Sequence, residues 1–390
     1  RRDGRARGRR SLTMAKRPDR SVPGIVVVDK PSGLTSHDVV SRMRRMAHTR
    51  KVGHAGTLDP MATGVLILGV GKATRLLTWI TGHEKSYTAT IRFGATTLSD
   101  DAQGELVEAR GCGSIDEGAL ESAMGELRGA IDQVPSTVSA KRIAGKRAYA
   151  LVREGVEVEL PANRVTIRRF ERVSPLRGAV LDGPDGPIGV VDVDVEVECS
   201  SGTYVRALAR DLGEALGCGA HLTALRRTRV GVFSLEDARP LSDLEAEAGR
   251  ALDEETRGGA EAALPDAEAA VPGHETAVPE GGARAPRPSA PRAEPSPCGA
   301  QHDPEPAPGL IPLADAVRML FPALVLDEEE AGRFAHGQAP SRPIGEANAI
   351  AGHRDERVIG AFNAAGEVLG LLEARKGRFA TLTVFQGAAQ

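Results

Sequence analysis

The feature that most constrains the fold is a proline-rich, acidic stretch at residues 253–308. It holds eleven of the chain's twenty-five prolines and almost no large apolar side chain. Such a segment buries too little apolar surface to offset the conformational entropy that ordering it would cost. We therefore interpret this stretch as a disordered acidic linker. We predict a large region at residues 21–240, an acidic linker at residues 241–310 and a small domain at residues 311–390.

Charge is unevenly distributed along the chain. The formal net charge is −3 over 390 residues. Residues 1–20 carry nine Arg and Lys against two Asp, whereas residues 241–310 carry fourteen Asp and Glu against five Arg. The remainder is close to neutral, so any nucleic-acid binding would need a local basic patch. We interpret residues 1–20 as a disordered basic leader, with Met14 as a candidate natural start.

Apolar periodicity predicts mixed secondary structure in the large region. The expected strands are residues 25–28, 65–70, 87–93, 164–169 and 190–199, and the expected helices are residues 36–46, 73–80, 114–127 and 204–216. In the small domain, helices are expected at residues 311–320 and 327–336, and strands at 357–362, 368–372 and 379–384. These patterns predict an α+β fold with a mixed, largely antiparallel sheet flanked by helices, plus a small β-rich domain.

A glycine-rich segment at residues 53–64, GHAGTLDPMATG, is the strongest candidate for chemistry. We call it the Asp59 loop. Asp59 is its only acidic residue, and the following Pro60 moves Asp59 out of the α region and offers no N–H for the carboxylate to cap. The loop therefore presents a carboxylate. The alternative is an ordinary Asp-Pro turn.

Motifs for other chemistries fail. Residues 69–74, GVGKAT, have Ala73 after the lysine and no glycine at position 66, so they do not fit a phosphate-binding P-loop. His37 and Asp38 have no further ligands at metal spacing, and the four cysteines lack CxxC spacing. No apolar run is long enough to span a membrane, and no signal peptide is recognisable. We predict no metal, no cofactor, no membrane association and a cytoplasmic location.

The three tyrosines each lie close to a cation in the sequence: Tyr87, Tyr149 and Tyr204. Flat rings beside cations suit unstacked RNA, because rings stack on bases while cations meet phosphates. The alternative is a set of half-buried tyrosines beside solvated charges. Residues 135–163 have no sustained hydrophobic period and are predicted to form a protruding arm that grips RNA through Lys141, Arg142, Lys146 and Arg147.

Arg206 gives a second indication of a buried acidic site. It lies in the first turn of the predicted helix 204–216, where the helix dipole disfavours a cation by roughly 0.3–1 kcal/mol. A carboxylate that stays ionised in a desolvated site needs a nearby cation. We therefore hypothesise that Arg206 pairs with Asp59. The alternative is that Arg206 is solvated on an exposed face.

Five segments together resemble the TruB family of tRNA pseudouridine synthases. Besides the Asp59 loop they are residues 29–36 (DKPSGLTS), 85–87 (KSY), 199–206 (CSSGTYVR) and 219–227 (GAHLTALRR). They occur in the family's order within residues 23–238. The resemblance implies the pseudouridine-synthase fold for residues 21–240 and a PUA-like RNA-binding domain at residues 311–390.

The resemblance also implies roles for individual residues. Asp59 would be the catalytic aspartate that attacks the flipped uridine, on C1′ of the ribose or on the base ring. Tyr87 would stack on the target base and help to remove its C5 proton, and Arg206 would pair with Asp59. Tyr204 and Leu225 would line the pocket, and His54 would help to hold the displaced nucleotides of the T loop. Lys30 would support the floor of the site, and Asp101 would join the polar network around it.

We therefore expect isomerisation of uridine to pseudouridine at position 55 in the T loop of tRNA. The reaction exchanges an N–C bond for a C–C bond without redox change or net hydrolysis, so one carboxylate in a closed pocket can suffice. The expected partner is the T arm of tRNA, bound by a monomer without guide RNA. One alternative is a non-catalytic tRNA-binding or tRNA-folding chaperone, which has no use for the Asp59 carboxylate. Another is a guide-dependent synthase, against which the basic arm argues.

Overall fold

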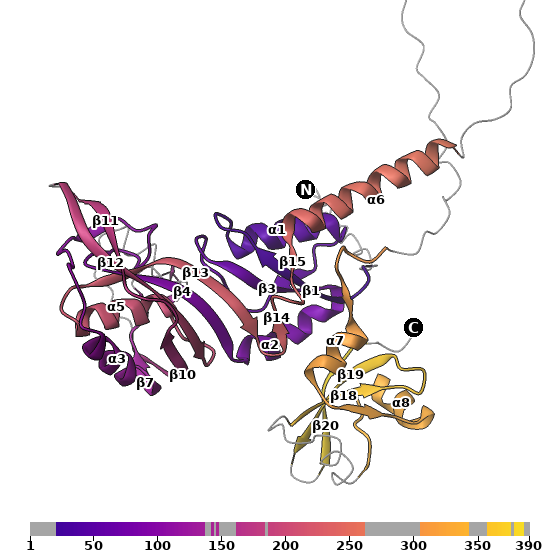
Figure 1. Cartoon of the computed structure of the whole chain (residues 1–390). Helices are drawn as coiled ribbons and strands as arrows, with labels where there is room; N and C mark the ends of the chain where they lie inside the picture. Colours follow the sequence, from indigo (N-terminus) through magenta and orange to yellow (C-terminus); the bar gives the residue numbers. More distant parts are fainter. Residues whose placement is uncertain are drawn as a thin grey trace, which may run out of the picture.

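The computed structural model describes residues 21–136, 142–143, 146–147, 161–183, 186–261, 305–342, 357–375 and 378–385. The predicted leader at residues 1–20 lies outside the described residues, as do most of the arm and the middle of the linker. Figure 1 shows an elongated region built on one large sheet, with a small β-rich unit beside one end of it.

The large region begins with alternating strands and helices. Its first half contains β1 (Gly24–Lys30), α1 (Ser36–Met46), β2 (Val52–His54), β3 (Thr63–Val70), the 3₁₀ helix η1 (Gly71–Leu76), α2 (Leu77–Gly82), β4 (Lys85–Phe93), β5 (Thr96–Thr97), β6 (Leu106–Glu108), α3 (Glu117–Glu126) and β7 (Gly129–Gln133). Its second half contains β8 (Arg142–Ile143), β9 (Lys146–Arg147), β10 (Asn163–Arg172), β11 (Arg177–Gly183), β12 (Gly186–Cys199), α5 (Val205–Ala215), β13 (Ala220–Val230), β14 (Phe233–Ser234), β15 (Arg239–Pro240) and α6 (Leu241–Glu261).

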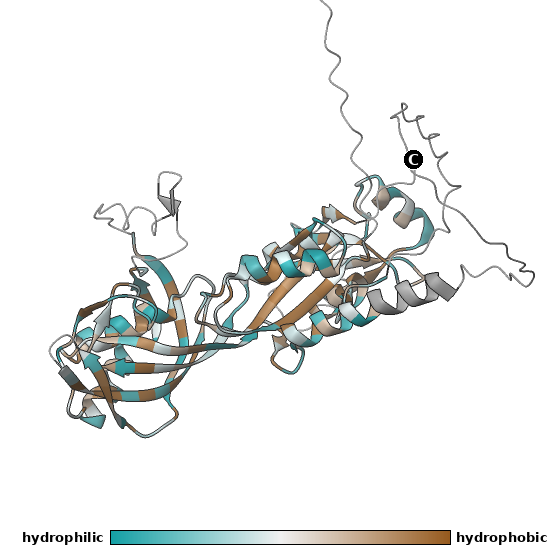
Figure 2. Cartoon of the chain, turned by 90° about the horizontal axis from the view of Figure 1, so that it is seen from above, coloured by the Kyte–Doolittle hydropathy of each residue, from teal (hydrophilic) through white to brown (hydrophobic). Residues whose placement is uncertain are grey.

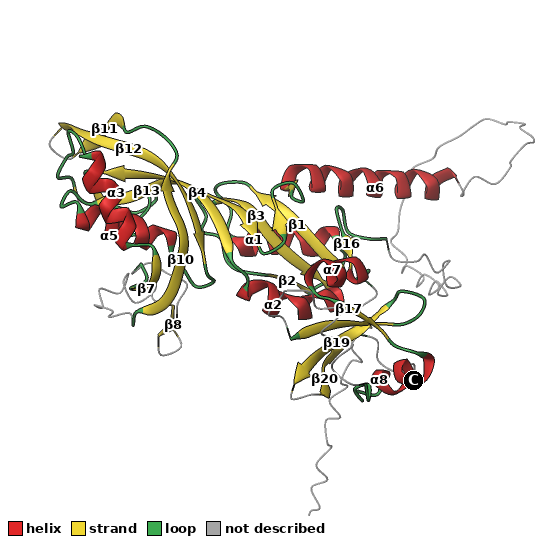
Figure 3. Cartoon of the chain, turned by 60° about the horizontal axis from the view of Figure 1, so that its bottom comes forward, coloured by secondary structure: helices red, strands yellow, loops and turns green. Residues whose placement is uncertain are grey.

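Most of these strands join one mixed sheet. Within the described residues it has twelve strands, and its main path runs β15-β1-β3-β13-β4-β12-β10-β7. The pairs β1–β15 and β3–β13 are parallel, whereas pairs such as β1–β3, β4–β13 and β4–β12 are antiparallel. Helices flank the sheet (Figure 3). The predicted mixed, largely antiparallel sheet is confirmed.

The strands β1 and β3 form the apolar centre of one half of the sheet. Both are near-continuous apolar runs that are buried on both faces, as strands covered by other elements on each side must be. Val26, Val28, Leu66 and Leu68 belong to one hydrophobic cluster, and their neighbours Ile25, Val27, Val65 and Ile67 belong to another. Figure 2 shows strongly hydrophobic strands in the middle of the molecule, with more polar helices over them.

The small C-terminal unit is β-rich, as predicted. It contains β16 (Ile311–Pro312), α7 (Leu313–Leu320), β17 (Ala323–Val325), α8 (Glu328–Ala335), β18 (Val358–Phe362), β19 (Val368–Arg375) and β20 (Arg378–Val384). The strands β17-β18-β19-β20 form a separate sheet with its own apolar cluster.

The two parts of the chain also share apolar packing. Residues of β1, β3, η1 and α2 form one buried cluster with residues of α7, β18 and β19 and with Phe385. We call this set the junction cluster. In addition, β16 pairs with β1 and α7 packs against β1, so the small unit is attached directly to the main sheet.

The predicted linker at residues 241–310 differs from the structure at both ends. Residues 241–261 form α6, in which Leu241 and Leu244 are buried in the main core and Glu245 is 3.1 Å from Arg42 of α1. At the other end Ala307 is also buried in that core. The prediction was wrong here because the acidic composition of the whole stretch masked two leucines spaced to lie on one helix face.

Several strands were not predicted, and the two longest of them are β11 and β13. β11 and β13 lie in the main sheet, and β13 is central to it, between β3 and β4. The β13 sequence, AHLTALRRTRV, carries three arginines and no clear alternation, so its local pattern is not that of a strand. Its arginines are accommodated by partners distant in the sequence, which a local pattern cannot reveal.

Helix termini follow their local chemistry. Thr35 caps α1 and forms a capping box with Asp38. Asp116 caps α3 by accepting from the Ala119 N–H at 2.7 Å, two residues after the start predicted for this helix. Gly217 follows α5 with φ +71°, a conformation that favours glycine after the end of a helix.

Candidate active site

The backbone of the Asp59 loop is held on both sides of Asp59. Ser36 Oγ accepts from the Leu58 N–H at 2.8 Å and donates to the Leu58 carbonyl at 3.1 Å. The Gly33 N–H donates to the Pro60 carbonyl at 2.8 Å. Both neighbours of Asp59 are thereby bonded to Gly33, in the turn after β1, and to Ser36, the first residue of α1. The backbone from which the carboxylate extends is therefore held in place.

Lys30, which was predicted to support the floor of the site, is hydrogen-bonded to the Asp59 loop. The fully buried side chain donates from Nζ to the carbonyls of Leu34 at 2.8 Å, Pro31 at 2.9 Å and Pro60 at 3.3 Å. Burial lowers its pKa to about 8, and the negative charge of Asp59 opposes that shift. Lys30 thus joins the end of β1 to the residue that follows Asp59.

Arg227, on β13, is a site residue that sequence reasoning missed. It is 1% exposed and donates to the carbonyls of Val65 at 2.7 Å, Gly56 at 3.2 Å and Thr57 at 3.3 Å. Gly64 has φ +96°, and a Cβ there would lie 2.2 Å from the Arg227 carbonyl oxygen, so only glycine fits this approach. The available signal was the Arg-Arg pair in the 219–227 segment, to which no role had been given.

The expected ion pair between Arg206 and Asp59 is present. Arg206 Nε is 2.9 Å from Asp59 Oδ2, and Nη1 is 3.4 Å from Asp101 Oδ2. Nη1 also donates to the Ser99 carbonyl at 2.6 Å. The side chains of Arg206 and Asp101 are 6% and 5% exposed, whereas that of Asp59 is 35% exposed. The alternative of a solvated Arg206 is wrong, and Asp59 is the member of the network that solvent can reach.

Asp101 is held by its own loop. Its Oδ1 accepts from Ser99 Oγ at 2.6 Å and from the Gln103 N–H at 3.0 Å, and its carbonyl accepts from Thr97 Oγ1 at 2.7 Å. A buried carboxylate with this many donors keeps a fixed orientation. Asp101 therefore supports Arg206 from the side opposite to Asp59.

The predicted pocket residues occupy three adjoining elements. Tyr87 on β4 is buried and lies opposite Arg227 of β13, and burial raises its pKa. Tyr204 is the N-cap residue of α5, two positions before Arg206, and burial also raises its pKa. Leu225 is buried on β13. Leu225 therefore shares β13 with Arg227, Tyr87 lies on the strand paired with β13, and Tyr204 precedes the helix that carries Arg206.

The interpretation of cations beside tyrosines as phosphate ligands is wrong for two of the three pairs. Lys85 is buried and donates from Nζ to the carbonyls of His83 at 2.7 Å and Thr81 at 2.9 Å, and burial lowers its pKa to about 8. Arg206 is occupied by carboxylates. Tyr149 lies outside the described residues. The sequence showed the nearby cations but not that they point into the protein.

His54 ends β2, at the start of the Asp59 loop. Its ring lies edge-on to that of His37, with 5.5 Å between centroids, and its pKa is lowered by burial and then by His37. Of the predicted RNA-gripping residues, Lys141 lies outside the described residues. For the other three the structure describes only backbone, which pairs as β8 and β9: Arg142, Lys146 and Arg147.

Neither a metal-binding cluster nor a membrane-spanning helix is found among the described residues. No group of three or more His, Cys, Asp or Glu side chains there is arranged to hold a metal ion. No helix in the same residues is long and apolar enough to cross a membrane.

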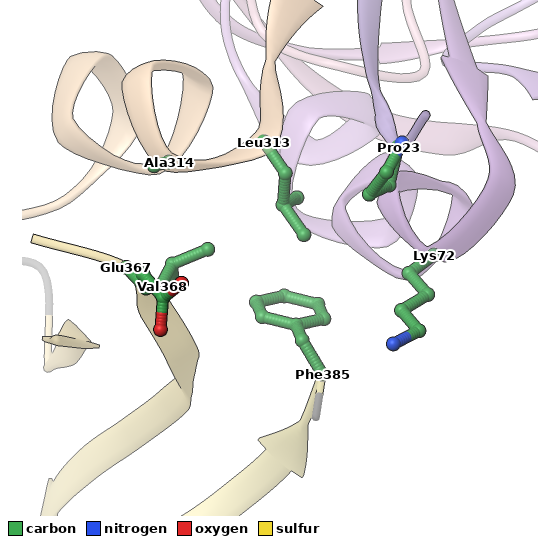
Figure 4. Close-up of a pocket in the computed structure, with 7 residues that line it drawn as sticks. All are labelled: Pro23, Lys72, Leu313, Ala314, Glu367, Val368 and Phe385. Carbon is green, nitrogen blue, oxygen red and sulfur yellow. The ribbon is translucent and has the colours of Figure 1, made fainter. Parts of the chain in front are cut away.

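A hollow lies away from the predicted catalytic residues. It has a volume of about 260 Å³ and is lined by residues of both parts of the chain: Pro23, Lys72, Leu313, Ala314, Glu367, Val368 and Phe385 (Figure 4). It adjoins the junction cluster, to which Leu313, Val368 and Phe385 belong. Ala314 also packs against that cluster, so four of the seven lining residues take part in the apolar packing between the two parts of the chain.

Known proteins resemble most of this chain. The model of the TruB family pseudouridylate synthase N-terminal domain matches residues 44–205, and that of the tRNA pseudouridylate synthase B C-terminal domain matches residues 206–271. The tRNA pseudouridine synthase B of Thermobifida fusca (strain YX) is 43% identical over 94% of this chain and 99% of its own. That of Arthrobacter sp. (strain FB24) is 61% identical over 57% of this chain and 71% of its own.

A solved structure shares the fold. A chain from an H/ACA RNP bound to a substrate RNA containing 2′-deoxyuridine matches with a TM-score of 0.55 at 20% identity. The match covers 96% of this chain and 92% of that one. The fold predicted from the sequence motifs is therefore confirmed.

Proposed function

Because this chain belongs to the TruB family of pseudouridylate synthases, we propose that it isomerises the uridine at position 55 in the T loop of tRNA, with Asp59 as the catalytic aspartate. The observation that carries the proposal is the ion pair of Asp59 with Arg206. A partly exposed carboxylate is held by a buried guanidinium at the end of a loop whose backbone is fixed on both sides.

Arg206 orients Asp59. Its guanidinium lies 2.9 Å from Asp59 Oδ2, and this contact with Nε fixes one oxygen of the carboxylate. A carboxylate prepared in this way is suited to attack the flipped nucleotide, on C1′ of the ribose or on the base ring. After the base rotates, a C5–C1′ bond replaces the N1–C1′ bond, C5 loses a proton and N1 gains one.

Tyr87 serves as a stacking surface. Burial raises its pKa above the ordinary value of tyrosine, so the hydroxyl stays protonated at neutral pH. A neutral phenol is a poor base but a good flat surface for a pyrimidine. We therefore assign it to holding the rotating base rather than to removing the C5 proton, with Leu225 and Tyr204 lining the same pocket.

The substrate must be opened before this chemistry. Flipping a nucleotide costs roughly a few kcal/mol, which contacts in the pocket and at the displaced nucleotides offset. We assign His54, the second residue of the Asp59 loop, to contacts with those nucleotides. Binding of tRNA without guide RNA by a monomer and the cytoplasmic location stay predictions. The non-catalytic chaperone is disfavoured because it gives the buried Arg206 network no purpose.

The test uses a T-arm stem-loop RNA labelled with tritium at C5 of the uridine at position 55. The purified chain should release the label and leave pseudouridine at that position only. The same RNA with cytidine at position 55 and labelled uridines elsewhere in the loop is the control for site selection. Retention of the tritium, or pseudouridine at a different position, would contradict the proposal. In cells without the protein, position 55 should remain uridine.

A further inference from the structure

Two buried polar side chains close to the Asp59–Arg206 pair have no part in the chemistry above. Gln133 is the last residue of β7, and Ser136 follows three residues later. Gln133 is 1% exposed and Ser136 is fully buried. Buried polar groups at such depth need hydrogen-bond partners, so the partners show what each side chain holds in place.

Gln133 holds the peptide that precedes α5. Its Oε1 accepts from the Tyr204 N–H at 2.8 Å, and its Nε2 donates to the Tyr204 carbonyl at 3.1 Å. Tyr204 is the N-cap residue of α5, and its own side chain makes no capping hydrogen bond. The Gln133 amide therefore fixes both the position and the tilt of the backbone two residues before Arg206.

Ser136 holds the loop on the other side of Arg206. Its Oγ donates to Asp100 Oδ2 at 2.6 Å. Asp100 has φ +58°, a left-handed conformation that costs a non-glycine residue free energy and persists only when its surroundings enforce it. Asp100 lies between Ser99, whose carbonyl accepts from Arg206, and Asp101, which pairs with Arg206.

Arg210 connects these two contacts. It lies on α5, one helical turn after Arg206, and donates from Nη2 to the Val134 carbonyl at 2.8 Å and from Nη1 to Asp100 Oδ2 at 3.4 Å. Residues 133–136 therefore contact the start of α5 on one side and the loop at residues 99–101 on the other. Arg206 lies in the first turn of α5, and its guanidinium contacts Ser99 and Asp101 of that loop.

We propose that Gln133 and Ser136 are positioning residues that set the place of Arg206 relative to Asp59, Gln133 through Tyr204 and Ser136 through Asp100. The proposal rests on the proposed function, because neither side chain is assigned a contact with RNA. Both act on the Arg206 guanidinium. Gln133 fixes the backbone from which the Arg206 side chain extends. Ser136 fixes the loop that carries its two partners, the Ser99 carbonyl and the Asp101 carboxylate.

The kinetic test compares Gln133→Ala, Gln133→Glu and Ser136→Ala with wild type on T-arm RNA. Single-turnover rate constants should fall about 10- to 100-fold in both alanine variants while the Kd for RNA stays within about threefold, because a small displacement of a catalytic group impairs chemistry more than binding. Gln133→Glu keeps the acceptor for the Tyr204 N–H and loses the donor, so its rate constant should be intermediate. A loss confined to Kd would overturn the proposal.

A double-mutant cycle separates positioning from loss of stability. In an Arg206→Lys background, Gln133→Ala should cost less than about threefold, because the guanidinium that Gln133 places is already absent. Additive losses would contradict action through Arg206. Val165→Ala on β10, a buried apolar truncation beside β7, is the matched control: it should lower stability while leaving the rate constant within about twofold.

A readout without RNA distinguishes failure of this proposal from failure of the proposed function. The ¹⁵N signal of the Arg206 Nε–H, assigned by its loss in Arg206→Lys, reports the bond to Asp59. It should shift or broaden in Gln133→Ala and Ser136→Ala and stay unchanged in Val165→Ala. An inactive wild-type protein would overturn the proposed function, whereas an unchanged signal in both alanine variants would overturn the positioning role.

Discussion

The surroundings of Asp59 and the junction cluster are both buried and both join distant parts of the chain, but they do so by opposite means. Around Asp59, the side chains of Lys30, Arg206 and Arg227 bind backbone carbonyls and carboxylates. At the junction, apolar side chains from β1, β3 and α7 pack against one another. Buried charged contacts are directional and costly when a partner is lost, whereas apolar contacts are not directional. The first region fixes geometry, and the second supplies cohesion.

The largest effect on activity is expected for a substitution of Asp59. Asp59→Asn should abolish tritium release from T-arm RNA, because an amide is not a competent nucleophile, while the Kd changes by less than about tenfold, or about 1.4 kcal/mol. Tritium release and filter binding on one preparation measure both. Asp192→Asn, which breaks an ion pair with Arg92 away from the loop, is the matched control and should keep near-normal activity. Residual turnover by Asp59→Asn would remove Asp59 from the chemistry.

Arg206→Lys should have the next largest effect. A lysine cannot reproduce the planar fork that reaches Asp59, Asp101 and the Ser99 carbonyl together, so the single-turnover rate constant should fall by about 100-fold or more. Arg92→Lys on the far part of the sheet is the equivalent change outside the site. Equal rate constants for Arg206→Lys and wild type would show that orientation of Asp59 does not depend on the guanidinium.

Leu320→Ala should affect the other region alone. Leu320 is 1% exposed in the junction cluster, and its truncation should lower the free energy of unfolding by about 2–5 kcal/mol. Urea unfolding measures this loss. At a temperature where the variant is folded, its single-turnover rate constant should match that of wild type. A reduced rate constant would mean that the junction also fixes the geometry of the site.

A smaller effect concerns pH. The contribution of Lys30 to stability should depend on pH, whereas that of the junction cluster should not. The pKa of Lys30 is about 8 in the folded protein and near its ordinary value of 10.5 when unfolded. Between these values the unfolded chain binds more protons, so the stability of wild type relative to Lys30→Met should rise by about 1–2 kcal/mol from pH 7 to pH 9.5. The loss of unfolding free energy caused by Leu320→Ala involves no titrating group, so it should not depend on pH. A pH-independent difference for Lys30→Met would contradict the lowered pKa.

The smallest effect is expected for the acidic stretch that joins the large region to the small C-terminal unit. Replacing residues 262–304 with a Gly-Ser sequence of equal length should leave the rate constant and Kd within about twofold, since the composition of this stretch cannot support a packed core. Retaining α6 and residues 305–312 preserves the packed ends. A large loss of tRNA binding would give the acidic stretch a role that its composition does not suggest.

The same contrast explains what the sequence could predict. The strands β1, β3 and β4 have strong local apolar patterns and were predicted to within two residues. The pairing of Asp59 with Arg206 was also predicted, because each residue carries its own local anomaly: a carboxylate before proline, and a cation in the first turn of a helix. Local chemistry sufficed in both cases.

Gln133, Ser136 and Arg227 could not be found in this way. Their hydrogen-bond partners are distant in the sequence, and nothing about a glutamine at the end of a short strand indicates that it will hold the start of a helix. The strand β13 was missed for the same reason, because its arginines are satisfied only after the sheet has assembled. The RNA-gripping role of the arm remains a prediction.

The pairing of β1 has a consequence for biosynthesis. One edge of β1 pairs with β3, and within the described part of the chain the other edge pairs only with residues 239–240 of β15 and 311–312 of β16. At a translation rate of about 5–20 residues per second, a nascent chain therefore waits on the order of ten seconds or more before that edge is fully covered. Until then an apolar strand offers unpaired backbone groups to other nascent chains. The pairing of this one strand of the main sheet is therefore completed only after Ile311 and Pro312 have been made, at the start of the small unit.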